Sequence, residues 1–208
     1  MAKNLPWLKL DTVLLFACLL CIHGCTSVRQ SRQSLDNLPA DLPPVVELSQ
    51  TPFYPQTEHQ CGPAALATIL QAHHVDVTPE TLSSQLYIPE RKGSLQIEMA
   101  VTARRYGMLP YPLNPEFTDL LSEIAAGNPV LVLQNLGFEW WPQWHYAVVI
   151  GYDITNNQLT LRSGTTKRWQ TTFATFENTW TRADHWALVI VPAGEVPETA
   201  SINTYLIT

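Results

Sequence analysis

Charged residues are scarce in this chain of 208 residues: Asp, Glu, Lys and Arg together make up 14%. The net charge of −6 is spread along the chain without a basic block, which argues against a phosphate-backbone partner, so we do not expect nucleic acid as a ligand. With 46% apolar residues, however, the chain can form a buried core. A wholly disordered protein is therefore excluded.

The sequence also lacks two cofactor signals. It contains no glycine-rich loop of the kind that binds phosphate and no Cys and His spacing typical of a zinc site. We therefore expect no cofactor and no metal. Sixteen prolines are too many for a helical bundle, and with nine glycines and seven tryptophans they indicate a compact mixed fold with several tight connections.

A short apolar run near the N-terminus has the features of a targeting segment. Two lysines precede ten apolar residues at 13–22, about half the length that spans a bilayer but typical of a signal-peptide core. The run ends in Ile22-His23-Gly24-Cys25, which resembles a bacterial lipobox, although His23 is unusual there. We interpret residues 1–24 as a lipoprotein signal peptide and Cys25 as the lipidated residue. A simple secretory signal that leaves Cys25 unmodified is the alternative.

The residues after Cys25 set the expected location. Thr26 and Ser27 lack the acidic residue that favours retention of such lipoproteins in the inner membrane, so the resemblance implies an outer-membrane anchor facing the periplasm. The other two N-terminal cysteines leave with the signal, and Cys61 is then the only remaining free thiol, with no disulfide partner. A lone thiol in an oxidising compartment is either buried and inert or present for its reactivity.

The rest of the chain divides into a tether, a domain and a tail. Residues 25–44 are rich in Ser, Gln and Pro and read as a flexible tether, residues 45–192 as the folded domain, and residues 193–208 as a polar tail. Helices are expected first, at 62–70, from Thr78, at 94–106 and at 118–126. Strands follow at 130–133, 146–150, 158–162, 167–171 and 186–191, with a hairpin turn at 156–157 and a short helix before the last strand. This order predicts an α+β fold with an antiparallel sheet of about five strands.

Cys61 stands at the start of the first predicted helix. The exposed amides at a helix N-terminus stabilise a thiolate and lower the pKa of the thiol, so this is a position suited to a nucleophile. A buried cysteine that packs as a small hydrophobic residue is the alternative.

A glutamine precedes this cysteine by five residues, in the stretch Tyr54-Pro55-Gln56-Thr57-Glu58-His59-Gln60-Cys61-Gly62-Pro63-Ala64-Ala65-Leu66. The side-chain amide of Gln56 and the backbone N–H of Cys61 could donate to the oxyanion of a tetrahedral intermediate. This stretch resembles the cysteine-peptidase segment of the C39 family, in which a Gln upstream of Cys-Gly is the oxyanion donor and the Cys the nucleophile. Gln60 is a competing donor, and either glutamine could simply lie on the surface.

A second stretch extends the resemblance. His145-Tyr146-Ala147-Val148-Val149-Ile150-Gly151 is similar to the strand that bears the general base in the C39 family. A histidine paired with a cysteine takes the thiol proton and later protonates the leaving amine. A structural role for His145 is the alternative. The other histidines have less suitable contexts: the signal segment, the end of the first helix, the loop before Cys61 and the start of the last strand, at 23, 73, 74, 59 and 185.

The third catalytic group departs from the family pattern. C39-type enzymes carry an Asp at the end of the strand after the His hairpin, where it orients the imidazole. Counted from His145, that position falls at Arg162 or Ser163. Ser163 could accept the imidazole N–H and complete a Cys-His dyad with a weak third member. Asp153 belongs to the far end of the His strand, and Asp184 is a remote candidate.

Aromatic residues crowd the segment just before His145. Residues 138–144 read Phe-Glu-Trp-Trp-Pro-Gln-Trp, which is too dense for an ordinary loop. Trp141 and Trp144 could form a substrate-binding wall. A loop that closes the core or lies on a membrane surface is the alternative.

Taken together, the resemblance implies a papain-like cysteine peptidase fold: N-terminal helices, with the nucleophile at a helix N-terminus, packed on a C-terminal antiparallel sheet. It is closest to the stand-alone lipoprotein branch of C39-like peptidases, and it implies hydrolysis of a peptide or protein substrate. A catalytically silent module that binds a peptide or an envelope partner is the rival reading. A cell-wall endopeptidase is disfavoured because Gln60-Cys61-Gly62 replaces the Asp-Cys-Ser of those enzymes.

Overall fold

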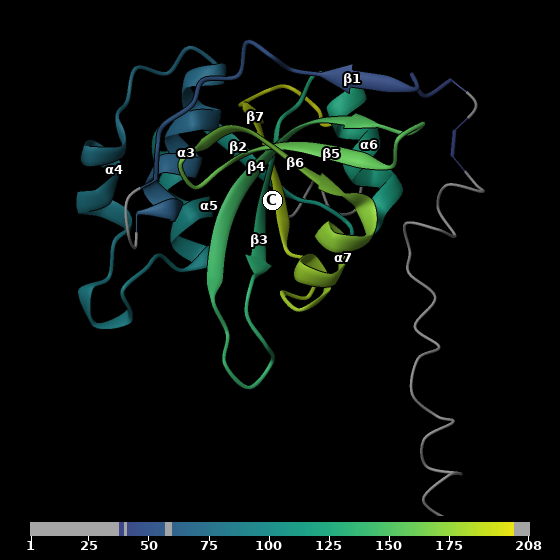
Figure 1. The fold of residues 1–208 in the computed structure, drawn as a ribbon. Helices are drawn as coiled ribbons and strands as arrows, with labels where there is room; N and C mark the ends of the chain where they lie inside the picture. Colours follow the sequence, from purple (N-terminus) through teal and green to yellow (C-terminus); the bar gives the residue numbers. More distant parts are fainter. Residues whose placement is uncertain (1–37, 40, 57–59, 202–208) are drawn as a thin grey trace, which may run out of the picture.

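The computed structural model describes residues 38–39, 41–56 and 60–201 (Figure 1). The predicted signal peptide, Cys25, most of the predicted tether, His59 and the last seven residues lie outside this described part. The elements are β1 (Val45–Glu47), α3 (Cys61–Ala72), α4 (Pro79–Leu86), η1 (Pro89–Arg91), α5 (Gln96–Arg105), β2 (Met108–Pro112), α6 (Phe117–Ala125), β3 (Val130–Asn135), β4 (Trp144–Asp153), β5 (Gln158–Ser163), β6 (Thr166–Thr172), α7 (Phe173–Thr181) and β7 (Ala187–Pro192). No helix among them is long and apolar enough to cross a membrane.

The strands form one antiparallel sheet in the order β2-β7-β3-β4-β5-β6, with β1 paired to β4. The α+β fold is confirmed, but the expected number of strands was wrong: the described residues form seven strands instead of about five. The two additional strands carry weak sequence signals. β1 has only three residues, and β2 contains Pro110 and Pro112, which are tolerated because β2 is an edge strand that pairs with β7 alone.

Helices cover both faces of the sheet. Figure 1 shows α3, α4 and α5 on one side and α6 and α7 on the other. The alternation of side chains along β3 explains this arrangement, because Leu131 and Leu133 pack into the core under the first group while Val130 and Val132 pack under the second. The continuous apolar run of β3 is therefore that of a strand buried on both faces.

Helix α3 is the central helix of the first core. Every residue from Gly62 to Leu70 is buried, and three of these residues are alanines, so neighbouring elements can approach the helix from all sides. A helix that is apolar all round is expected to be enclosed, and this enclosure fixes the position of its first residue, Cys61.

Most helix ends follow the sequence signals. Thr78 caps α4 through its side chain, and Gly107 and Gly127 follow α5 and α6 with positive φ angles of 75° and 96°. The expected start of the third helix at Ser94 was wrong, since α5 begins at Gln96. Ser94 instead belongs to the irregular segment that approaches the start of α3.

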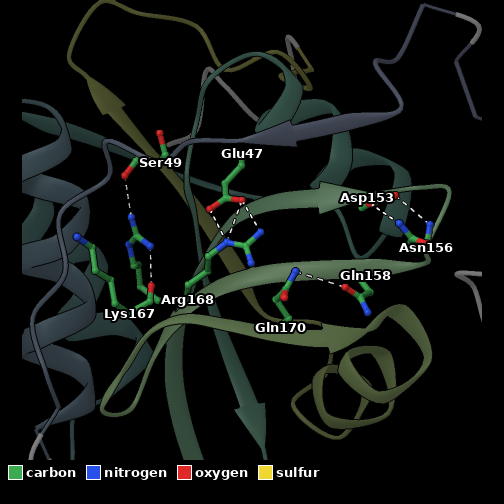
Figure 2. Close-up of polar contacts among 9 residues, drawn as sticks. Glu47, Ser49, Asp153, Asn156, Gln158, Lys167, Arg168 and Gln170 are labelled. Carbon is green, nitrogen blue, oxygen red and sulfur yellow. Dashed lines mark hydrogen bonds and ion pairs between the residues drawn. The ribbon is translucent and has the colours of Figure 1, made fainter.

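Segments at both ends of the domain pack on the second core. Leu38 and Leu42 contact it from the region predicted to be a tether. Figure 2 shows Glu47 of β1 beside Arg168 of β6, where the two side chains form an ion pair of 2.8 Å. In the predicted tail, both the backbone N–H and the hydroxyl of Thr199 donate to the buried carboxylate of Glu123, each at 2.7 Å.

Candidate active site

Cys61 is the first residue of α3 and is partly buried. Three backbone amides, those of Tyr146, Gly62 and Cys61 itself, lower the pKa of its thiol. Burial has the larger effect and raises the pKa above its usual 9.0. The direction is opposite to that expected from the helix N-terminus alone, because enclosure of α3 removes water that would stabilise a thiolate.

His145 is the second residue of β4 and is held by the next strand. Its Nε2 atom lies 2.9 Å from Oγ of Ser163, the last residue of β5. Of the two positions left open by counting, Arg162 and Ser163, only Ser163 therefore contacts the imidazole. Burial lowers the pKa of His145 below its usual 6.5, and among the described residues no carboxylate contributes an opposing shift.

Gln56 is fixed between β4 and the turn after β5. Its Nε2 donates to the carbonyl of Tyr146 at 3.4 Å, and its Oε1 accepts from the backbone N–H of Gly164 at 3.1 Å. The backbone N–H of Gln56 also donates to the carbonyl of Gly164. The competing residue, Gln60, is the N-cap residue of α3 and makes no side-chain capping bond.

Tyr146 contacts both Cys61 and Gln56. Its backbone amide faces the thiol of Cys61 while its carbonyl accepts from Gln56, so both residues are tied to the residue that follows His145. The Tyr146 hydroxyl donates to the carbonyl of Ser94 at 3.3 Å. Burial and the nearby Cys61 raise the pKa of the Tyr146 phenol, which keeps it neutral.

One pocket of about 960 Å³ contains Cys61, His145, Gln56 and Trp144 on its wall. Trp141, the other predicted substrate residue, does not line it. Four further regions line this pocket. Residues 91–96 contribute Arg91, Lys92, Gly93, Ser94, Leu95 and Gln96, and the facing ends of β3 and β4 with their connection contribute Leu133, Pro142, Gln143 and Tyr146. The turn after β5 contributes Gly164, and the turn before β7 contributes Ala183 and Asp184.

The electrostatics of this pocket favour neutral side chains. Burial raises the pKa of Cys61 and lowers the pKa of His145, so each shift favours the uncharged form of its group. Both effects disfavour a resting thiolate–imidazolium pair.

The other candidates from the sequence lie elsewhere or at the rim. Asp153 accepts from Asn156 in the β4–β5 turn, at the opposite end of the strand from His145. His185 contacts Thr181 through Nε2 and packs its ring on Trp180. Asp184 is the only carboxylate on the pocket wall, but no contact to His145 is present among the described residues.

Residues 91–96 contribute to the pocket and carried no functional signal in the sequence. They comprise the last residue of η1, an irregular connection at 92–95 and the first residue of α5, and Ser94 lies against the first turn of α3. In the sequence, Ser94 predicts only a helix start. Contact between this segment and Gly62 arises from packing of α5 on α3, which no local pattern reveals.

Metal ligands are not grouped at this pocket. Within residues 38–39, 41–56 and 60–201, no three His, Cys, Asp or Glu side chains lie together as a metal site requires. The polar groups of the site are a thiol, an imidazole, an amide and a hydroxyl, a set suited to acyl transfer.

A cysteine at the start of a buried helix, with a histidine on an adjacent antiparallel strand, is the arrangement of papain-like cysteine peptidases. Residues 48–188 match the Peptidase_C39 like family, and the chain belongs to this family. The match spans the described helices of the first core and all strands from β2 to β6.

Solved structures share the fold. A C39-like peptidase from Bacillus anthracis aligns with a TM-score of 0.60 and 18% identity over 73% of this chain and 99% of that one. The peptidase domain of Streptococcus ComA, a bifunctional ABC transporter in a quorum-sensing pathway, gives 0.56 and 19% over 69% and 99%. A double-glycine-motif protease from a PCAT transporter, solved with its leader peptide, gives 0.53 and 18% over 70% and 94%. No curated protein sequence matches the chain.

Proposed function

We propose that this protein is a cysteine peptidase that cleaves peptide bonds through Cys61 and His145. The observation that carries the proposal is the single pocket that holds Cys61, His145 and Gln56, with His145 bonded to Ser163. Membership of the C39-like family supports the same reaction class. The peptide found with the PCAT protease supports a peptide as the occupant of this pocket, with Trp144 as part of its wall.

The proposed reaction begins with attack of the Cys61 sulfur on the carbonyl carbon of a peptide bond. Because Nε2 of His145 faces Ser163, Nδ1 is the nitrogen left to accept the thiol proton. The amides of Cys61 and Gln56 donate to the oxyanion. Collapse of the intermediate breaks the C–N bond, the amine leaves with the proton from His145, and water then hydrolyses the thioester to a carboxylic acid.

Gln56 needs only a small change to serve as the oxyanion donor. One amide hydrogen is used in the long bond of 3.4 Å to the Tyr146 carbonyl, which leaves the second for a substrate. The bonds to Gly164 hold the amide plane. This preorganisation supports Gln56 over Gln60 as the donor.

A catalytically silent binding module is the second candidate. Two observations favour it: the surroundings of Cys61 raise the thiol pKa, and a hydroxyl occupies the position where the family carries a carboxylate. A silent module would use the same pocket to hold a peptide without cleaving it.

We also propose that the protein is a lipoprotein of the bacterial cell envelope, anchored through Cys25 to the outer membrane and facing the periplasm. The support is the apolar run at 13–22 and the lipobox-like Gly24-Cys25. Metabolic labelling with a radioactive fatty acid tests it: wild-type protein should incorporate label and Cys25→Ala should not. Label retained by Cys25→Ala would contradict the proposal.

Cleavage of a mixed peptide library, followed by mass spectrometry, tests the peptidase directly. We expect Cys61→Ala and His145→Ala to abolish cleavage, and Gln56→Ala to reduce the rate by about 100-fold or more. The matched controls are Gln60→Ala and His185→Ala, which should retain activity. Equal losses in Gln56→Ala and Gln60→Ala would contradict the assigned donor.

Alkylation of Cys61 by iodoacetamide separates the two candidates without a known substrate. If His145 acts as the base, a titration from pH 4 to 9 should show a wild-type rate above that of His145→Ala near pH 7, where a neutral imidazole can take the proton of a thiol that is still protonated. A silent module should give the same curve for both proteins, governed by a single thiol pKa above 9.0. Identical curves would favour the silent binding module over the peptidase.

A further inference from the structure

The loop between β3 and β4 carries three exposed aromatic side chains that the proposed reaction does not use. Phe138, Trp140 and Trp141, which we call the aromatic tip, are 66%, 78% and 66% exposed. None of them lines the pocket that contains Cys61. Figure 1 shows the β3–β4 hairpin extending beyond the rest of the domain, and the three side chains of the aromatic tip are exposed to solvent.

The aromatic tip is built on a rigid turn. Phe138 and Trp141 exchange two backbone hydrogen bonds of 3.2 Å, and the rings of Phe138 and Trp140 stack with centroids 5.5 Å apart. The buried side chain of Asn135 accepts from the amides of Gly137 and Gln143 at 2.9 Å each. Because the backbone is held in this way, the aromatic side chains are displayed without an additional loss of backbone entropy on binding.

The close backbone packing around Gly137 also indicates that this turn is rigid. A Cβ atom there would collide with the carbonyl of Trp141 and would lie 3.0 Å from the amide of Gln143. The loop therefore requires glycine in order to fold back on itself. The three aromatic side chains are therefore exposed on a turn whose backbone conformation is fixed.

The charge of the hairpin indicates what kind of surface it fits. Residues 136–144 contain one acidic residue, Glu139, and no Lys or Arg. An anionic partner such as nucleic acid or an acidic lipid patch is therefore not attracted. Trp and Phe, with an apolar ring body and in Trp a polar N–H, are the residues typical of the boundary between headgroups and acyl chains.

We propose that the aromatic tip inserts into the interface of a lipid bilayer with neutral headgroups. A projecting hairpin suits a deformable lipid surface, and the lipobox-like Gly24-Cys25 gives a separate reason to expect a membrane near the domain. The inference goes beyond the proposed peptidase function. Because Pro142, Gln143 and Trp144 line the pocket and continue into this hairpin, insertion would bring the pocket close to the bilayer surface.

Quenching of tryptophan fluorescence by brominated lipid tests this proposal. Full-length protein, in its natural processed form, is incorporated into vesicles of dioleoylphosphatidylcholine, with or without a fraction of dibrominated phosphatidylcholine. Wild-type protein should be quenched. The double variant Trp140→Phe, Trp141→Phe should lose the quenched component, whereas Trp169→Phe, which removes an exposed tryptophan of β6, should keep it.

A second variant keeps every tryptophan in place. Phe138→Glu adds a charge to the aromatic tip and should abolish the quenching, whereas Val196→Glu, at a similarly exposed position of 64%, should leave it unchanged. Circular dichroism checks that each variant is folded. Unquenched wild-type protein that still floats with the vesicles would overturn the proposal and assign the tip to a protein partner. Quenching that survives in the double variant would also overturn it. Neither result depends on peptidase activity.

Discussion

At the scale of single residues, the contact between Ser163 and His145 governs the chemistry of the pocket. Oγ of Ser163 lies 2.9 Å from Nε2 of His145. A hydroxyl can donate to the imidazole or accept from it, whereas a carboxylate can only accept, so serine neither fixes the tautomer nor stabilises an imidazolium as strongly. Burial therefore lowers the pKa of His145, and no described carboxylate counteracts it.

Replacement of Ser163 by Asp should raise the pKa of His145. A carboxylate at this distance favours the charged imidazole and typically shifts the pKa by about one unit or more. The C2–H resonance of His145, followed by NMR through a pH titration, measures the shift, and the alkylation rate of Cys61 at pH 6 should rise with it. Ser163→Asn is the control because it can accept a hydrogen bond without a charge. An unchanged titration in Ser163→Asp would contradict this account.

Two partly buried histidines should make the stability depend on pH. Burial lowers the pKa values of His73 and His145 below their usual 6.5, so the unfolded chain binds more protons than the folded one as the pH falls below 6.5. Their contribution to stability is complete above that pH and is lost progressively below it. The urea midpoint of wild-type protein should therefore fall between pH 7.5 and 5. The double variant His73→Gln, His145→Gln should show a flatter dependence.

At the scale of elements, the packing of residues 91–96 on the first turn of α3 shapes the wall beside Cys61. Gly62 has no side chain, and a Cβ there would lie 2.5 Å from Oγ and 2.8 Å from Cβ of Ser94. The Ser94 hydroxyl is itself buried and has no partner among the described residues. The glycine after Cys61 is thus required by contact between two elements, since its φ angle is not in the left-handed region.

Gly62→Ala should destabilise the protein by about 1–3 kcal/mol, because the new methyl group displaces the segment that packs on α3. Ser94→Gly removes the colliding atoms, so the double variant should recover much of the loss. Thermal unfolding of the four proteins completes a double-mutant cycle. Additive losses in the double variant would show that Gly62 and Ser94 are not coupled and would contradict the packing explanation.

At the scale of the whole molecule, the segment after β7 closes the second core. Glu123 of α6 is fully buried, and its carboxylate accepts from the backbone and hydroxyl of Thr199 and from Asn128, each at 2.7 Å. The backbone amide of Ser201 donates to the hydroxyl of Tyr111 on β2. The end of the described chain therefore joins a helix on one face of the sheet to an edge strand.

Removal of residues 193–208 should lower the free energy of unfolding by about 3 kcal/mol, because it leaves the carboxylate of Glu123 buried with two of its three donors missing. Chemical denaturation in urea measures the loss. Thr199→Val, which removes only the hydroxyl bond, should cost about 1 kcal/mol. Glu123→Gln should destabilise the full chain more than the shortened one, and equal effects in both would contradict this role of the carboxylate.

The sequence by itself determined the elements whose signals are local. Helix α3 follows from Pro63 and a run of small apolar residues, Gly107 and Gly127 end their helices, and the strands from β3 to β7 follow from apolar and β-branched runs. The pattern around Cys61 and the strand after His145 were likewise sufficient to indicate the C39-like family, because both are continuous in the chain.

The remaining features depend on contacts between residues that are distant in the chain, so only the tertiary structure decided them. Strands β1 and β2 form by pairing with β4 and β7, and without those partners their short or proline-containing sequences give no strand signal. Enclosure of α3 raises the pKa of Cys61, although its helix position alone predicts the reverse. Contact across two strands selects Ser163 as the neighbour of His145, since a count along the sequence does not distinguish it from Arg162.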